Sequence, residues 1–383
     1  MRDAYIAAAK RTPIGRLSGA LAGCAASDLG AAVLRALTEG VGLDPEGVDE
    51  VILGQVLTGG AGQNPARQSA IKAGLPVSVP AATVNMVCGA GQRSIHLAAQ
   101  AIKCGDAEVV LAGGQDSMTQ APHLLYGLRE PVKTGDRTVK DSMVVDGLWD
   151  AFHDVHMGTT VEGLARRYQI TRDEQDRFAL ASQQKAAAAW AEGRFDAEVV
   201  PVAGVGRDEH PNPRTSLETL AKLKPAFDSE GTITAGNSSG LNDGAAGVVV
   251  GSGEGLARRG LEPVVRIASY ASAGVEPLDM GLGPAAAARR ALDKAGWRTC
   301  DLDVLEINEA FAAQAIAVNR EMGWDPARIN RNGGAIALGH PLAGSGCRIV
   351  VSLVHEMLRL DARRGLAALC IGGGQGVAVC LER

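Results

Sequence analysis

Short apolar runs alternate with amphipathic stretches along most of the chain. The runs "EVILGQV" (50–56) and "EVVLAGG" (108–114) have the length and β-branched content of buried strands. Ahead of both runs, "SDLGAAVLRALTEG" (27–40) places its apolar residues at helical spacing. Strands that alternate with helices predict βα units, and therefore the α/β class.

The C-terminal third repeats this pattern. Residues 332–358 predict a glycine-rich turn that opens a helix, and residues 365–381 predict a strand, a glycine turn and a second strand. The segments "LAGGQDS" (111–117) and "CIGGGQG" (370–376) each place Gly-Gly-Gln after an apolar run. We interpret this echo as two similarly folded halves that meet along a cleft.

The region 118–245 differs from both halves. It collects tryptophan, phenylalanine and charged helical segments, including "TRDEQDRFALASQQKAAAAWAEGRF" (171–195), where Thr171 and Glu174 form the signature of a capping box. We therefore expect a helix there, and a lid-like insertion between the halves. The predicted division is an N-terminal half over 1–117, an inserted loop domain over 118–245, a return to the first half over 246–266, and a C-terminal half over 267–383.

Composition and charge restrict the classes of function. The chain has 383 residues, 46% of them hydrophobic, and its net charge of −5 comes without any basic run, which argues against nucleic-acid binding. Seven cysteines are spread out with no CxxC pair, so neither a disulfide framework nor a zinc site is expected. No run approaches ~18 apolar residues, and the N-terminus does not read as a signal peptide. We expect a cytoplasmic protein with no membrane segment.

The stretch "VNMVCGAGQRS" (84–94) places a thiol where a strand-like run gives way to a helix. A helix N-terminus favours the thiolate, so we expect the pKa of Cys88 to lie below its ordinary value of about 8.5. The alternative is a buried, inert cysteine on a tight turn.

Three further glycine-rich or polar segments carry candidate chemistry: "NEAFA" with Asn308, "GGAIALGHPLAGSG" with His340, and "CIGGGQG" with Cys370. Flanking glycine and proline suit His340 to a close approach to a ligand. A cysteine and a histidine together are the usual equipment of thiol nucleophilic catalysis. A second cysteine on a glycine turn is less usual.

Nine segments in order carry a resemblance that runs from end to end: "AKRTPIGRLSGAL", "VLTGGAGQNPARQSAIKAGLP", "VNMVCGAG", "GGQDSMTQAPH", "HMGTTVE", "AGNSSGLNDGAA", "NEAFA", "GGAIALGHPLAGSG" and "CIGGGQG". The chain resembles the thiolases, specifically the short-chain acetyl-CoA C-acetyltransferases of the biosynthetic type. The resemblance implies a duplicated βα fold in five layers, αβαβα, with a loop domain inserted in the first half. It also implies a homo-oligomer, either a tetramer or a dimer. Acetyl-CoA, acetoacetyl-CoA and CoA would be its substrates and products, and it would need no cofactor or metal.

The resemblance also implies roles for individual residues. Cys88 resembles the acylated nucleophile, His340 its activating base, and Cys370 the acid and base that moves a proton at the α-carbon of the second acyl-CoA. Two oxyanion holes would be the backbone N–H groups of Cys88 and Gly372, and His340 together with a water held by Asn308.

Substrate-binding residues follow in the same way. His156 and Met157 resemble a pair that lines the acyl pocket of the short-chain class, and Ser239 resembles a residue that contacts the pantetheine arm. Positive charge for the phosphates of CoA would come from Arg214, Lys222 and Lys224.

Three alternatives remain open at this stage. A degradative thiolase that cleaves longer 3-ketoacyl-CoAs would use the same catalytic residues with a wider pocket, against which His156 and Met157 argue. A non-catalytic acyl-CoA-binding or lipid-binding relative would be expected to lose at least one of the catalytic residues, and all are present. A redox sensor built on Cys88 and Cys370 could coexist with catalysis.

Overall fold

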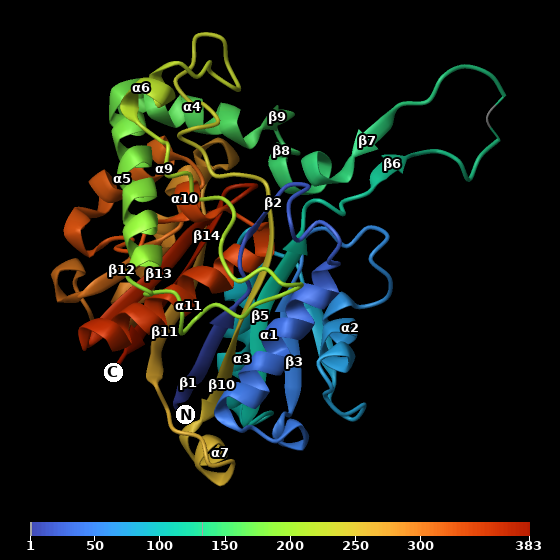
Figure 1. Ribbon diagram of the computed structural model, residues 1–383, viewed down its shortest axis with the longest axis vertical. Coiled ribbons are helices and arrows are strands. Elements are labelled where there is room, and N and C mark those ends of the chain that lie inside the picture. Colours follow the sequence, from blue (N-terminus) through green and yellow to red (C-terminus); the bar gives the residue numbers. More distant parts are fainter. Residues whose placement is uncertain (1, 132) are drawn as a thin grey trace.

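The computed structural model describes residues 2–131 and 133–383 (Figure 1). Its strands are β1 (Ala4–Arg11), β2 (Gly15–Arg16), β3 (Glu50–Gly54), β4 (Ala81–Val84), β5 (Val109–Ser117), β6 (His123–Leu125), β7 (Val139–Asp141), β8 (Trp149–Asp150), β9 (Val155–His156), β10 (Asn242–Ser252), β11 (Val265–Gly274), β12 (Val304–Ile307), β13 (Arg364–Ile371) and β14 (Gln375–Glu382). Its α-helices are α1 (Ala26–Val41), α2 (Pro65–Lys72), α3 (Ala90–Cys104), α4 (Met157–Arg167), α5 (Arg172–Ala191), α6 (Leu217–Ala221), α7 (Gly253–Arg258), α8 (Gly283–Ala295), α9 (Ala312–Met322), α10 (Ala335–Leu338) and α11 (Leu342–Leu360). A π-helix covers η2 (Met143–Leu148), and short 3₁₀ helices cover η1 (Pro45–Gly47), η3 (Pro277–Leu282), η4 (Thr299–Asp301) and η5 (Pro326–Arg328).

The strands and helices predicted from the apolar patterns are confirmed. β3, β5, α1 and the β13–β14 pair lie within or close to the predicted ranges, and α5 begins with the capping box of Thr171 and Glu174. Nine strands follow one another in the order β12-β13-β14-β11-β1-β10-β5-β3-β4, with β2 paired to β10. β1 joins the two halves because it pairs with β10 along its length and with β11 at Tyr5 and Ile6.

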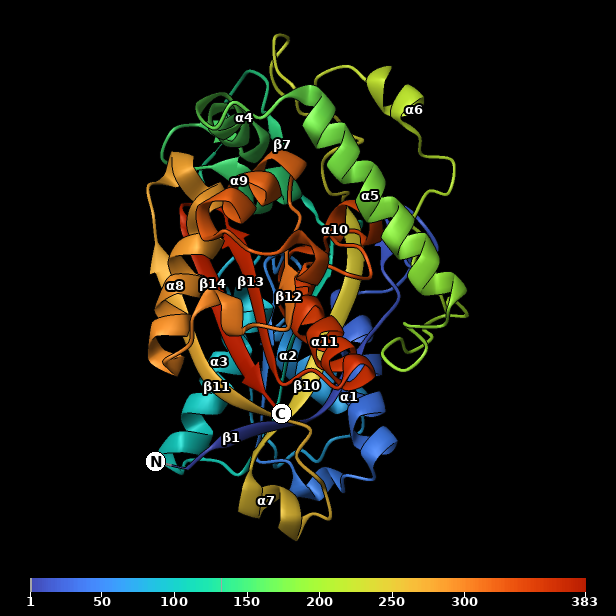
Figure 2. The same cartoon turned by 90° about the vertical axis from the view of Figure 1, so that its left-hand side faces the viewer.

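Helices cover and separate the two halves of this sheet. α1 and α2 pack on the outer face of the first half, and α8 and α9 pack on the outer face of the second half. α3 and α11 lie between the halves, in one apolar cluster with side chains from both, such as Val110 and Val248 on one side and Leu369 and Val379 on the other (Figure 2). The α/β prediction and the five layers αβαβα are therefore confirmed.

Glycines allow the two central helices to start side by side. A Cβ atom at Gly114 of β5 would lie 2.2 Å from the carbonyl oxygen of Ala343 in α11, and one at Gly91 of α3 would lie 2.3 Å from the same oxygen. At Gly346 a Cβ atom would lie 3.0 Å from the carbonyl oxygen of Cys88. These close backbone contacts bring the start of α3, beside Cys88, next to the start of α11, beside His340.

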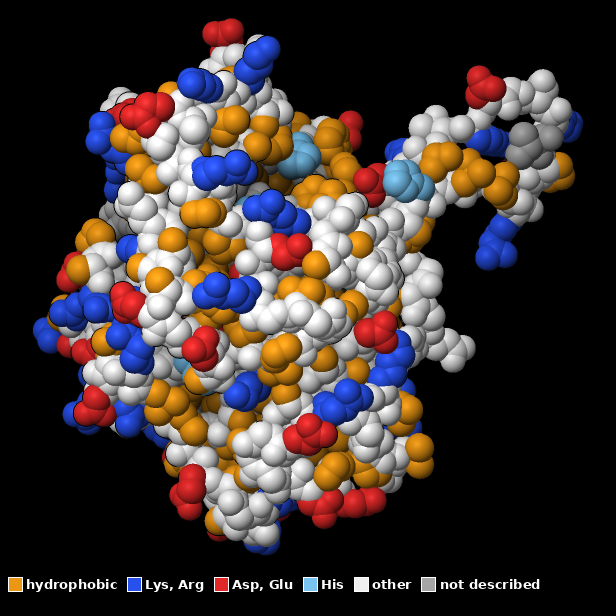
Figure 3. Space-filling model, in the orientation of Figure 1, with side chains coloured by type: hydrophobic (Ala, Val, Ile, Leu, Met, Phe, Trp, Pro, Cys, Tyr) orange, Lys and Arg blue, Asp and Glu red, His pale blue; other side chains and the backbone are white. Residues whose placement is uncertain are grey.

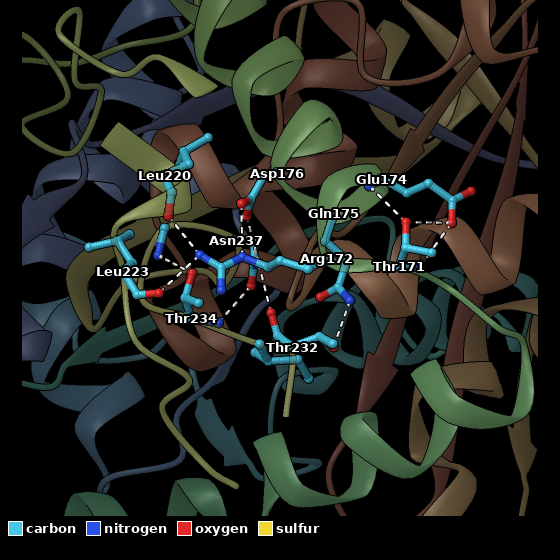
Figure 4. Close-up of polar contacts among 12 residues, drawn as sticks. Thr171, Arg172, Glu174, Gln175, Asp176, Leu220, Leu223, Thr232, Thr234 and Asn237 are labelled. Atoms are coloured by element: carbon cyan, nitrogen blue, oxygen red, sulfur yellow. Dashed lines mark hydrogen bonds and ion pairs between the residues drawn. The ribbon is translucent and has the colours of Figure 1, made fainter. Parts of the chain in front are cut away.

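The region between the halves forms α4, α5, α6 and a projecting hairpin. At the start of α5, Arg172 donates to the carbonyl oxygens of Leu220 and Leu223 and pairs with Asp176, which also accepts from Asn237 (Figure 4). This network fixes the loop that follows Asn237. The arm around β6 and β7 extends away from the body (Figures 1 and 3). In the described parts of the chain, no helix combines the length and apolar character needed to cross a membrane.

Candidate active site

A mostly apolar cavity of about 520 Å³ lies where the two halves meet the inserted region. It is lined by seven of the residues predicted from the sequence: Cys88, His156, Met157, Ser239, His340, Cys370 and Gly372. Segments far apart in the chain therefore bring both cysteines and the histidine to one enclosed volume.

Cys88 follows β4 and precedes α3. Val87 has a left-handed φ of 45°, and the helix begins at Ala90. Burial raises the pKa of Cys88 to about 11, and the charge of Asp116 also raises it, while the backbone N–H groups of Gly372 and of Cys88 itself lower it. The expectation of a lowered pKa is wrong, because the desolvation of the thiolate exceeds the stabilisation by these N–H groups. The same two N–H groups are those predicted as an oxyanion hole.

His340 is held from several sides. Its backbone N–H donates to Oδ1 of Asn242 over 2.9 Å, and Nδ1 of its ring lies 2.5 Å from Oγ of Ser345. Burial, and to a smaller extent the charge of Arg348, lower the pKa of His340 to about 4. The imidazole is therefore neutral near pH 7, and Ser345 occupies Nδ1, which leaves Nε2 for chemistry in the cavity.

Cys370 is the second-last residue of β13, and the turn that follows the strand passes through Gly373 and Gly374, whose φ values are 82° and 83°. Its side chain is buried, and burial and the neighbouring charge of Cys88 both raise the pKa of its thiol. Both thiols line the same cavity. A thiol of raised pKa gives a strongly basic thiolate once it is deprotonated.

Asn308 follows β12 and does not line the cavity. Its side chain is buried, and its Oδ1 accepts from Arg348 over 3.4 Å. Arg348 is also buried and pairs with Glu306 over 3.4 Å. Nδ2 of Asn308 has no hydrogen-bond partner among residues 2–131 and 133–383. The structure thus places Asn308 behind the cavity, linked through Arg348 to the surroundings of His340.

His156 and Met157 close the cavity at the start of α4. Nδ1 of His156 accepts from the N–H of Gly158 over 3.0 Å, so His156 caps the helix. Its ring stacks on Phe227 with 4.6 Å between ring centroids, and burial lowers its pKa. Stacking and capping together fix this wall of the cavity.

A second cavity of about 540 Å³ continues from the first, and the two share His210, Ala235 and Leu241. Ser239 lies beside this junction and donates its backbone N–H to the carbonyl of Ala310. The three predicted cations are not brought into the first cavity. Arg214, Lys222 and Lys224 are exposed, and their neighbours Thr215 and Leu223 line the second cavity.

Four residues that position this site were not found from the sequence: Asp116, Asn242, Ser345 and Arg348. Asn242 and Ser345 bond His340 directly, and Asp116 accepts the N–H of Ala343 in the same helix start. Asp116 and Asn242 carried a usable signal, because each is polar at the end of a predicted strand or in a glycine-rich turn. Ser345 and Arg348 carried none beyond their place in a helix.

Comparisons with known proteins agree along the whole chain. The family descriptions "Thiolase, N-terminal domain" and "Thiolase, C-terminal domain" match residues 4–254 and 261–383. The chain is 59% identical over 392 residues to an acetyl-CoA acetyltransferase of Pseudomonas aeruginosa and 55% identical over 392 residues to one of Cupriavidus necator, with 100% of each chain covered. A crystal structure of the acetyl-CoA acetyltransferase of Bacillus anthracis superposes with a TM-score of 0.97 at 42% identity, covering 100% of this chain and 99% of that one. The chain belongs to the thiolase family.

Proposed function

We propose that the protein is an acetyl-CoA C-acetyltransferase. It condenses two molecules of acetyl-CoA to acetoacetyl-CoA and CoA, and cleaves acetoacetyl-CoA with CoA in reverse, through an acyl group carried by Cys88. The observation that carries this proposal is the meeting of Cys88, His340 and Cys370 in one apolar cavity. The similar proteins from Pseudomonas aeruginosa and Bacillus anthracis are acetyl-CoA acetyltransferases, which supports it.

Acylation begins with transfer of the Cys88 proton to Nε2 of His340. The low pKa of His340 keeps the ring neutral and able to accept this proton. Cys88 sulfur bonds to the acyl carbon, and the thioester oxygen becomes an oxyanion that accepts from the N–H groups of Cys88 and Gly372. The bond to the CoA sulfur then breaks, and His340 returns the proton to it. Because one thioester replaces another, this exchange is nearly isoenergetic.

Condensation uses the second cysteine. Nε2 of His340, neutral again after CoA leaves, takes the proton of Cys370, and the resulting Cys370 thiolate takes a proton from the methyl group of the second acetyl-CoA. The enolate oxygen accepts hydrogen bonds from the Nε2–H group of His340 and from a water held by Asn308. The enolate carbon attacks the acyl carbon on Cys88, the bond between that carbon and the Cys88 sulfur breaks, and the departing sulfur receives the proton held on Nε2 of His340. Buried side chains around Cys370 support this step, since a desolvated thiolate is a stronger base.

The substrate class follows from the closed end of the cavity. His156 is stacked on Phe227 and caps α4, so a longer acyl chain would need both to move. We therefore favour a short-chain enzyme over a degradative thiolase. A CoA-dependent cleavage assay decides between them: acetoacetyl-CoA should be cleaved well and a six-carbon or longer 3-ketoacyl-CoA poorly, whereas the reverse preference would contradict the assignment.

The inserted region, 118–245, is proposed as the CoA-binding domain, within the division into 1–117, 118–245, 246–266 and 267–383. The pantetheine arm would pass Ser239, and the nucleotide would occupy the second cavity. Arg214, Lys222 and Lys224 would then lie near its phosphates, with Arg16 in the cavity wall. Charge reversal of Lys222 should raise the KM for acetyl-CoA and leave kcat nearly unchanged.

We also propose a homotetramer, with a dimer as the alternative. The projecting arm exposes Leu125, Tyr126, Leu128 and Val139, an apolar set that a single chain leaves in water (Figure 3). Light scattering after gel filtration should give a tetramer for the unaltered chain and a smaller assembly for Leu128→Glu. Leu358→Glu, on exposed α11 surface, is the matched control. A monomer in the unaltered chain would contradict the proposal. A cytoplasmic location is proposed as well, supported by seven free cysteines.

A further inference from the structure

Asp116 is a fully buried carboxylate at the end of β5. It belongs to the "LAGGQDS" segment, to which the proposed reaction assigns no role. No basic side chain pairs with it among residues 2–131 and 133–383. Burial of an unpaired charge is costly unless hydrogen bonds compensate it, so this residue calls for a physical explanation.

Its oxygen atoms accept only backbone N–H groups. Oδ1 accepts from Val56 over 3.2 Å and from Leu57 over 3.1 Å, both in the loop after β3. Oδ2 accepts from Ala343 over 2.8 Å. Ala343 lies in the first turn of α11, three residues after His340. One side chain thus joins β5, the loop after β3 and the helix that follows His340.

The position suits a carboxylate better than any neutral group. The first N–H groups of a helix lack partners within it, and the positive end of the helix dipole favours a negative charge there. Two oxygens serve donors that come from two different directions. Burial raises the pKa of Asp116 to about 7, and the N–H groups of Leu57, Ala343 and Val56 lower it, so the carboxylate is ionised under mildly alkaline assay conditions.

Asp243 provides a comparison on the neighbouring strand. It lies on β10, one register position from the partner of Asp116, and it is buried as well. It accepts from the backbone N–H of Thr119 over 2.9 Å and from its hydroxyl over 2.6 Å. These bonds hold the base of the projecting arm rather than α11.

We propose that Asp116 is a positioning residue for the reaction: its carboxylate fixes the first turn of α11, and with it His340, against the half of the molecule that carries Cys88. The proposal rests on the proposed function, in which His340 takes the proton of Cys88. Asp116 does not line the cavity, so its effect is on the geometry of the reacting groups and not on binding of the substrate.

The test compares Asp116→Asn with Asp243→Asn in the full chain. The amide keeps one oxygen but turns an NH₂ group toward an N–H donor, so one of the bonds to Val56, Leu57 or Ala343 is lost. The assay is exchange of labelled CoA into acetyl-CoA. Asp116→Asn should lower kcat by ~10- to 100-fold with KM for acetyl-CoA nearly unchanged, because misplacement of a catalytic group by about 1 Å has effects of this size. Asp243→Asn should keep kcat within a few-fold of the unaltered protein.

Several outcomes would overturn the proposal. These are an unchanged kcat in Asp116→Asn, a loss expressed only in KM, or an equal loss of kcat in Asp243→Asn at similar thermal stability. If Asp116→Asn does not fold, hydrogen exchange of the unaltered protein decides: the Ala343 amide should exchange slowly despite its place in a first helical turn, and fast exchange would refute the bond to Asp116. Absence of CoA exchange in the unaltered protein would instead contradict the proposed function, and the Ala343 measurement would still test the contact itself.

Discussion

Replacement of Gly114 by alanine is expected to separate the two catalytic helices. Gly114 lies in β5, where the carbonyl group of Ala343 in α11 passes directly over it. An added Cβ atom would lie 2.2 Å from that oxygen and 2.8 Å from the carbonyl carbon of Ala343 and from Cα of Gly91. All three obstacles are backbone atoms, so no side chain can rotate away.

The size of the effect follows from these distances. Cβ atoms essentially never approach another heavy atom closer than 3.0 Å, so α11 must move away from β5 by roughly 1 Å. Such overpacking costs about 1–3 kcal/mol of unfolding free energy. The same displacement carries His340 away from Cys88, and a shift of about 1 Å lowers the rate of a positioned proton transfer by up to ~10²-fold.

Two measurements on Gly114→Ala test both consequences. Urea denaturation should show the loss of stability, and the CoA exchange assay should show a lower kcat in protein that is still folded. Gly163→Ala is the matched control, since Gly163 is exposed within α4 and no atom lies within 4 Å of its added Cβ; it should gain up to ~1 kcal/mol from helix propensity and keep its activity. Gly114→Ala with the stability and kcat of the unaltered protein would refute the close approach of α11 to β5.

Three further changes are expected from the environments of the cysteines and of a buried histidine. Cys370→Ala should retain CoA exchange far better than acetoacetyl-CoA synthesis, which should fall by ~10²–10⁴ because the carbon base is lost; equal losses measured on folded protein would show that Cys370 is not specific to carbon proton transfer. Alkylation of Cys88 by iodoacetamide, followed by peptide mapping, should accelerate steadily from about pH 7 to about pH 10, because burial raises its pKa to about 11; a plateau below about pH 9 would disprove that environment. Burial lowers the pKa of His96 in the folded protein to about 3, whereas its pKa in the unfolded chain is about 6.5. Between these two pH values only the unfolded chain binds the proton, so the free energy of unfolding falls as the pH falls. Between about pH 7 and about pH 5, the free energy of unfolding of His96→Phe, measured by urea titration, should therefore fall by ~2 kcal/mol less than that of the unaltered protein. An equal fall in both proteins would contradict this.

Local sequence patterns predicted much of the fold. The apolar runs were sufficient to predict β3 and β5, and the amphipathic pattern was sufficient to predict α1. In each of these elements the spacing of the apolar residues matches the side chains that the fold buries. The glycine turns also marked the cavity, since Cys88, His340 and Cys370 all lie where glycine lets a backbone approach a ligand. The join between the halves, at two residue pairs of β1 and β11, carried no local signal.

The pKa values of the site residues depend on how deeply each side chain is buried, and burial cannot be read from a sequence. A helix start suggested a lowered pKa for Cys88, but the desolvation that dominates it comes from segments remote in the chain. The sequence marks Asp116 only as a polar residue at a strand end. It does not show that the N–H group of Ala343, from the other half of the molecule, donates a hydrogen bond to its carboxylate. Arg214 and Lys222 are exposed and do not line the first cavity. A sequence shows that these residues are positively charged, but it does not show which cavity they lie beside.

The central claim is that the reaction passes through an acyl group on Cys88. Brief incubation of the protein with radiolabelled acetyl-CoA, followed by acid quenching, proteolysis and peptide mapping, tests it most directly. The label should reach the peptide that contains Cys88, persist in Cys370→Ala and vanish in Cys88→Ala. A label found only on the Cys370 peptide, or retained in Cys88→Ala, would contradict the account.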